Sequence, residues 1–231
     1  MRQGLFASLV SVLVLAGTVP APAAPVDEVL MPLGQYNTAK GRTLATTYHP
    51  QLVQLYEHIY HCIPWVDLQK SGIGFRTPKG ATGDERYLSV WIWIDQSNED
   101  GSFGSLPQER RVSAMMSRYG VEMLRRMTAL GPLARDNNLA GFSVILSWIK
   151  PGSGRLGAPL VNETLAFFAD RAGTVDFLTK KLPASEYIGR ARVAVFDGKD
   201  ELGRLPLEIW DDSFVTTYKL PNYAPPKNQR C

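Results

Sequence analysis

The sequence predicts a single α+β domain with a largely antiparallel or mixed sheet and packed helices. Three observations lead to this prediction. Residues 86–150 have the order strand, helix, strand; two pairs of strands are separated by turns typical of hairpins; and no long linker or internal repeat divides the chain. We expect the rest of the domain to be arranged around the strand–helix–strand unit.

The first strand of this unit, residues 86–95, is rich in β-branched and aromatic side chains. Side chains alternate along a strand, so Tyr87, Trp91 and Trp93 share one face and aliphatic residues share the other. Both faces are mostly apolar, which predicts a central strand. The second strand, residues 142–149, has a similar apolar face that includes Trp148.

Between the two strands lies a segment with the spacing of an amphipathic helix. Ser105 and Gln108 are close to a capping box at its start, and Gly131-Pro132 ends the pattern. Apolar residues recur between them every three or four positions. They are Val112, Met115, Met116, Tyr119, Met123, Met127 and Leu130.

The rest of the chain divides into an N-terminal arm, a globular domain and a tail. Residues 24–48 are weakly patterned and predict an irregular arm, residues 49–220 form the globular domain, and the Pro-rich residues 221–231 form the tail. Within the domain we predict helices at 50–63, 174–182 and 183–190, strands at 73–76, 192–197 and 204–210, and a Gly-rich loop at 151–159. Residues 162–170 fit either a helix or a strand, and we favour the strand.

The N-terminus has the features of a secretory signal peptide. Arg2 precedes an apolar run over residues 5–16, which is followed by the small-residue site Ala21-Pro22-Ala23. The run is short for a membrane span, and no other segment is long and apolar enough. We therefore expect cleavage after residue 23 and export to the periplasm or the cell exterior as a soluble chain without a transmembrane segment.

The net charge of the chain argues against nucleic acid as a partner. The formal net charge of +3 falls to +2 when the signal peptide, with one base and no acids, is removed. This charge is too small to predict nucleic-acid binding.

Export favours one disulfide between Cys62 and Cys231. Two unpaired thiols, or pairing of Cys231 between chains, stay open because the sequence supplies no geometry.

Two sets of side chains are candidates for non-catalytic binding. Trp91, Trp93 and Tyr87 form an aromatic patch that can stack on sugars or apolar ligands, unless it belongs to the core. Three arginines spaced by seven residues predict either a solvated helix face or a basic stripe for anions. They are Arg111, Arg118 and Arg125, with Glu122 interrupting the stripe.

Catalytic and metal-binding signals are sparse. His58 and His61 are three residues apart on one predicted helix and can approach one metal ion, although two surface histidines give the same pattern. The G-x-S-x-G and H-E-x-x-H motifs of hydrolases are missing from the sequence, and no cofactor is predicted. A hydrolase would have to use His49, His58 or His61, alone or with a metal.

The sequence therefore leaves two main functions open and does not decide whether the chain is an enzyme. The first is an exported, non-catalytic domain that binds an unknown ligand or an envelope protein. The alternative is an exported, metal-assisted hydrolase that uses the histidines. A purely structural envelope protein is a third interpretation.

Overall fold

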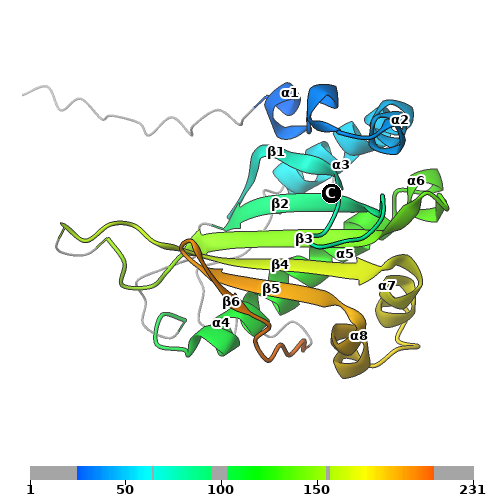
Figure 1. The fold of residues 1–231 in the computed structure, drawn as a ribbon. Helices are drawn as coiled ribbons and strands as arrows, with labels where there is room; N and C mark the ends of the chain where they lie inside the picture. Colours follow the sequence, from blue (N-terminus) through cyan, green and yellow to red (C-terminus); the bar gives the residue numbers. More distant parts are fainter. Residues whose placement is uncertain (1–24, 64, 95–102, 155–156, 211–231) are drawn as a thin grey trace, which may run out of the picture.

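The computed structural model describes residues 25–63, 65–94, 103–154 and 157–210, and the structural statements below concern those residues. They form one α+β domain with a mixed six-stranded sheet and packed helices (Figure 1). The fold class predicted from the sequence is therefore confirmed.

Strands that follow one another in the chain are also neighbours in the sheet, in the order β1-β2-β3-β4-β5-β6. All neighbours are antiparallel except β2 and β3, which are parallel. A parallel pair needs a long crossover, and the helical segment between β2 and β3 supplies it. The strands are β1 Val66–Arg76, β2 Arg86–Ile94, β3 Leu139–Ile149, β4 Asn162–Asp170, β5 Arg192–Asp197 and β6 Asp200–Gly203.

The helices precede β1 or connect later strands. They are α1 Val26–Val29, the 3-10 turn η1 Leu33–Gln35, α2 Ala39–Thr47, α3 His49–Cys62, α4 Gln108–Met115, the π-helical turn η2 Met116–Gly120, α5 Val121–Thr128, α6 Pro132–Arg135, α7 Arg171–Leu178 and α8 Ala184–Arg190.

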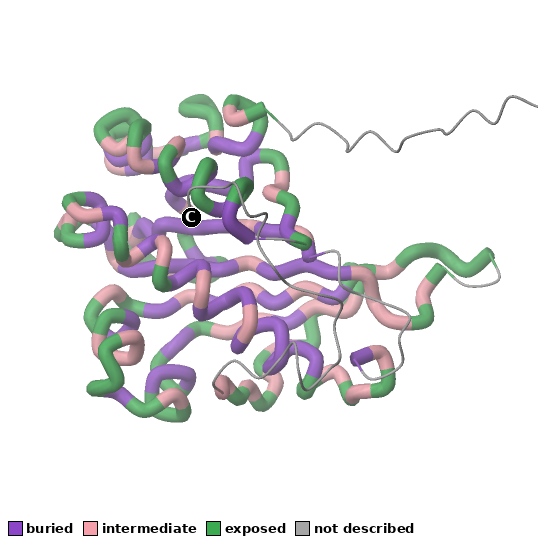
Figure 2. The backbone as a smooth tube through the Cα atoms, turned by 180° about the vertical axis from the view of Figure 1, so that it is seen from behind, coloured by how far each residue is buried: buried purple, intermediate pink, exposed green. Residues whose placement is uncertain are grey.

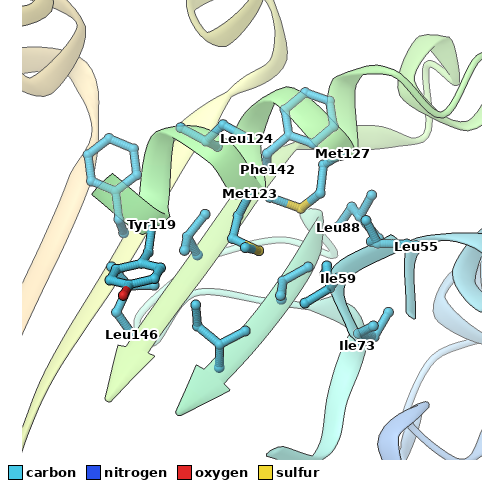
Figure 3. Close-up of a cluster of buried hydrophobic side chains, with 14 of the residues drawn as sticks. Leu55, Ile59, Ile73, Leu88, Tyr119, Met123, Leu124, Met127, Phe142 and Leu146 are labelled. Carbon is cyan, nitrogen blue, oxygen red and sulfur yellow. The ribbon is translucent and has the colours of Figure 1, made fainter. Parts of the chain in front are cut away.

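The predicted strand–helix–strand unit is present at the centre of the domain. We call α4, η2 and α5 together the crossover helix. Its apolar stripe packs on β2, β3 and α3 (Figure 3). The predicted stripe residues are all buried, so the helical spacing identified this face correctly. They are Val112, Met115, Met116, Tyr119, Met123, Met127 and Leu130.

The start of the crossover helix differs from the prediction. Its N-cap is Pro107, and no side chain caps it, so the capping box predicted from Ser105 and Gln108 is wrong. The physical reason is register: the helix begins at Gln108, which leaves Ser105 two residues before the cap position. Pro107 suits this place because it needs no hydrogen bond for a backbone N–H.

The N-terminal arm is more ordered than predicted. Residues 24–48 were expected to be irregular, but α1, η1 and α2 lie within them. Thr38 caps α2 by accepting a hydrogen bond from the Gly41 N–H at 3.2 Å, and Leu44 and Ala45 are buried beneath it. The weak apolar pattern hid α2 because this short helix buries few large side chains.

The first hairpin is confirmed, but its first strand is longer than predicted. β1 begins at Val66 rather than at residue 73, and it pairs antiparallel with β2. The pairing is irregular between Leu68 and Ile73, where Ser71 has a φ of 53°. This irregularity interrupts the side-chain alternation on which the prediction depended.

The second hairpin is confirmed only in part. β5 has the predicted bounds, but the second strand is β6, Asp200–Gly203, instead of residues 204–210. Residues 205–210, which we call the strap, pack against the crossover helix. The Oγ atoms of Ser113 and Ser117 accept hydrogen bonds from the backbone N–H groups of Glu208 and Trp210 at 3.0 and 3.2 Å. The strap is therefore hydrogen-bonded to serine side chains of the crossover helix and does not join the sheet.

The two faces of the sheet have different surroundings. The crossover helix and α3 lie behind the sheet in Figure 1 and in front of it in Figure 2. On the opposite face, turned toward the viewer in Figure 1, no described helix lies over the central strands. We call this second surface the open face.

Candidate binding face

The open face consists of side chains that alternate with the core residues of β2 to β5. Leu88, Val90, Ile92 and Ile94 point to the helices and are fully buried, so the residues between them point the other way. Most large side chains of the open face are half-buried rather than buried. They are Trp91, Trp93, Ile145, Ile149, Phe168 and Phe196.

A chain of polar contacts holds Trp91 across the sheet. Its indole Nε1 donates a hydrogen bond to Ser147 Oγ at 3.0 Å, and Ser147 Oγ lies 3.0 Å from Thr164 Oγ1. The chain crosses β2, β3 and β4. Above the ring, the guanidinium carbon of Arg76 lies 5.8 Å from the ring centroid, within the range of a cation–π contact. Trp91 therefore has a fixed orientation before any ligand binds.

Trp93 lies further along β2, on the same face as Trp91. Its neighbours in register are Asp67 of β1 and Ser147 of β3, and its side chain is half-buried. Small or polar neighbours leave part of the indole ring accessible. Trp93 is thus the predicted aromatic residue best placed for contact with a ligand.

Tyr87 has a different environment from the two tryptophans. It is only 7% exposed, and its ring contacts that of Phe168 edge-on, with centroids 5.5 Å apart. The two rings meet across β3, beside Gly141, which has no side chain. Burial is the main cause that raises the pKa of Tyr87. Tyr87 therefore shares the predicted face but forms its covered end.

The three arginines of the predicted basic stripe have three different environments. Arg111 is buried and makes a two-pronged ion pair with Glu163 of β4. Arg118 is half-buried, whereas Arg125 is exposed, 3.6 Å from Glu122. A π-helical turn between the first and the last changes their angular relation, so seven-residue spacing does not place them in one stripe. An anion-binding role stays a prediction.

Glu163 is a buried acid that the sequence did not single out. Its Oε2 accepts hydrogen bonds from Arg111 Nε at 2.9 Å and from Trp148 Nε1 at 2.7 Å, and the carboxylate is fully buried. Arg111 also donates to the carbonyl of Leu106. This cluster ties the crossover helix to β3 and β4. The sequence signal that could have identified Glu163 is an acid within the apolar strand 162–170. Its partner Arg111 could not be identified in the same way, because the pairing depends on tertiary structure.

The histidines lie on α3 at the surface. His61 pairs with Glu57 at 2.9 Å, and His58 lines a groove of about 310 Å³ between α3 and α5 with Arg125 and Arg126. His49 begins the helix. Within the described ranges, no three His, Cys, Asp or Glu side chains are grouped to hold a metal ion. The metal-assisted hydrolase stays an untested alternative.

The remaining predictions fall partly or wholly outside the described residues. Cys62 is buried at the end of α3, and Cys231 lies outside the described residues, so the disulfide stays a prediction. The signal peptide, residues 1–23, and the tail, residues 221–231, also lie outside them. Across the described ranges, no helix combines the length and apolar character needed to cross a bilayer.

Comparisons with protein-family models, with curated proteins and with solved structures gave no match.

Proposed function

We propose that this protein is an exported, non-catalytic binding domain that holds its ligand on the open face of the sheet. Trp91 and Trp93 are the contact rings. The observation that carries the proposal is the contrast between the two faces of β2, since the aliphatic face is fully buried and both indoles on the other face are only half-buried.

Physical chemistry supports a binding role for such a face. Tryptophan offers a large apolar surface at a low cost in side-chain entropy, and it is enriched among the residues that dominate binding energies. Contiguous exposed apolar surface on a folded chain commonly marks an interaction site. Here the aromatic surface lies on rigid central strands, so little conformational freedom is lost when a ligand binds.

Export is the second part of the proposal and depends on the N-terminal sequence. An apolar run followed by Ala21-Pro22-Ala23 supports cleavage after residue 23. The ligand is then a molecule of the cell envelope or of the exterior.

The test replaces the contact rings and measures binding. Trp93→Ala and Trp91→Ala are prepared with Tyr60→Ala as the control, because Tyr60 is an exposed ring on α3, outside the open face. Ligands are sought with envelope extracts and arrays of oligosaccharides, and affinities are measured by calorimetry. We expect Trp93→Ala to weaken binding at least tenfold and Tyr60→Ala to leave it unchanged. Equal affinity for wild type and both tryptophan variants would refute the proposal.

A further inference from the structure

Two buried hydroxyl groups on the open face have no hydrogen-bond partner among the described residues. Ser89 of β2 and Ser143 of β3 are fully buried, and neither Oγ atom has a partner in the described part of the chain. The two residues are direct neighbours in the parallel register of β2 and β3. Both therefore lie in the same row of the face that carries Trp91 and Trp93.

Such a pair of hydroxyls is costly for a folded chain. A buried polar group without a partner loses its hydrogen bonds to water and gains none in return. Alanine at either position would keep the strand and avoid this loss. Because native chains satisfy nearly all buried polar groups, the two serines need an explanation beyond folding.

The surroundings of the two serines point to a ligand. In the next row toward one end of the sheet, Arg76 of β1 pairs with Tyr87 of β2. The Nε atom of Arg76 is also buried and has no partner within the described ranges, while its Nη2 donates to the Ser71 carbonyl at 2.6 Å. Three unsatisfied polar atoms thus lie beside the half-buried indole ring of Trp91, on the face that also carries Trp93.

We infer that the ligand of the open face is a saccharide, whose hydroxyl groups bond to Ser89, Ser143 and Arg76 while its ring packs on Trp91 and Trp93. This inference rests on the proposed function and specifies its ligand class. A sugar ring presents C–H groups to an indole and hydroxyls at its rim, and a serine hydroxyl can both donate to and accept from such hydroxyls.

Access to the two serines requires a small opening of the face. Both hydroxyls are covered in the folded chain. Arg76 is half-buried, lies over the Trp91 ring and donates a hydrogen bond from Nη2 to the Ser71 carbonyl, so its side chain turns aside at the cost of these two contacts but without unfolding a strand. The ligand then replaces the cation–π contact with stacking on the ring.

The unsatisfied atoms also argue against an apolar ligand. A lipid or other hydrocarbon on this face would leave all three polar atoms without partners and would remove them further from water. Sites that hydrogen-bond a ligand reject analogues without the matching groups because their own polar groups are left unpaired. The polar atoms therefore select a hydroxyl-rich ligand over an apolar one of similar size.

The test separates the effect of the hydroxyls on binding from their effect on folding. The mature chain is screened on an array of neutral, amino and acidic oligosaccharides, with decanoate as an apolar probe in solution. The tightest oligosaccharide is then titrated into wild type, Ser89→Ala, Ser143→Ala and Ser117→Ala. Ser117 is the control because its Oγ makes hydrogen bonds within the crossover helix and to the strap, away from the open face.

We expect opposite results from the open-face serines and the control. Ser89→Ala and Ser143→Ala should each weaken binding by about three- to tenfold, the effect of one hydrogen bond, while the melting temperature stays equal or rises. Ser117→Ala should lower the melting temperature and leave the affinity unchanged, because the hydroxyl that it loses supports the fold.

Four outcomes would overturn the inference. Unchanged affinity of both open-face serine variants, with loss of binding in Trp93→Ala, would leave the proposed function standing and remove the saccharide contacts. If Ser89→Ala and Ser143→Ala lower the melting temperature as much as Ser117→Ala does, the hydroxyls of Ser89 and Ser143 have partners within the fold. Tighter binding of decanoate than of every oligosaccharide would identify an apolar ligand. Failure of wild type to bind any array member would exclude a saccharide ligand.

Discussion

Removing the charge of Glu163 should destabilise the domain more than any conservative change on its surface. The substitution Glu163→Gln keeps the size and shape of the side chain. It leaves the guanidinium of Arg111, whose side chain is 10% exposed, without its counter-charge beneath the crossover helix. The introduced amide offers one acceptor oxygen where the carboxylate accepts hydrogen bonds from Arg111 Nε, Arg111 Nη2 and Trp148 Nε1.

The size of the effect follows from the burial of both partners. Breaking a buried ion pair from one side costs about 3–5 kcal/mol, because one charge stays buried without compensation. For a domain of this length that loss corresponds to a fall in melting temperature of about 10 °C. Replacing both partners, as in Arg111→Met with Glu163→Met, removes both charges. It leaves mainly the Trp148 N–H without an acceptor, at a cost of about 1–3 kcal/mol.

The assay is urea unfolding of wild type, Glu163→Gln and the double variant, followed by tryptophan fluorescence and circular dichroism. Arg111→Met and Glu163→Met, each alone, complete the double-mutant cycle. The double variant should be more stable than either single methionine variant. A loss below about 1 kcal/mol for Glu163→Gln, or single effects that simply add in the double variant, would refute the ion-pair reasoning.

Three further predictions concern a carboxylate, the strap and the cysteines. A hydrogen bond from the Asn138 N–H lowers the pKa of Asp136 below its ordinary value of 3.8, with help from the Tyr48 hydroxyl. The ionised Asp136 carboxylate therefore stabilises the fold above pH 3.8, and this stabilisation is lost as the pH falls below that value. In acid unfolding curves, the difference in unfolding free energy between wild type and Asp136→Asn should shrink over the same pH range. Ser117→Ala removes the acceptor for the Trp210 N–H and should cost about 1 kcal/mol in urea unfolding, with faster exchange of that amide. If Cys62 and Cys231 pair, the denatured exported chain should weigh two hydrogen atoms less than the reduced chain; equal masses would exclude the disulfide.

Much of the architecture could be predicted from side-chain periodicity. The three- and four-residue spacing from Val112 to Met127 identified the buried face of the crossover helix, and alternation in residues 86–95 separated the two faces of β2. These patterns are readable because burial on one side is repeated over many residues. The same alternation placed Trp91, Trp93 and Tyr87 together correctly.

The predicted strand bounds are wrong where tertiary contacts override local sequence patterns. Residues 205–210 alternate like a strand, but the hydroxyls of Ser113 and Ser117 hold them against a helix. The N–H groups of the strap could not be assigned to these acceptors without knowing which elements meet in space. A polar irregularity at Ser71 likewise hid the first half of β1.

The candidate site could be predicted only in part for a related reason. The aromatic residues were visible in the sequence, but the placement of Arg76, Ser89 and Ser143 beside one another depends on the register of three strands. Arg111 was assigned to a surface stripe because its buried partner lies 52 residues away in sequence. Long-range partners of this kind leave no periodic signal.

Nuclear magnetic resonance of the tryptophan indole groups tests the central claim most directly. The chain is labelled with nitrogen-15, and the tightest oligosaccharide from the array is added stepwise. The indole signals of Trp91 and Trp93 should shift in proportion to saturation, whereas Trp148, fully buried on the opposite face, should keep its position. Saturable binding that shifts Trp210 of the strap, while Trp91 and Trp93 keep their positions, would contradict binding on the open face.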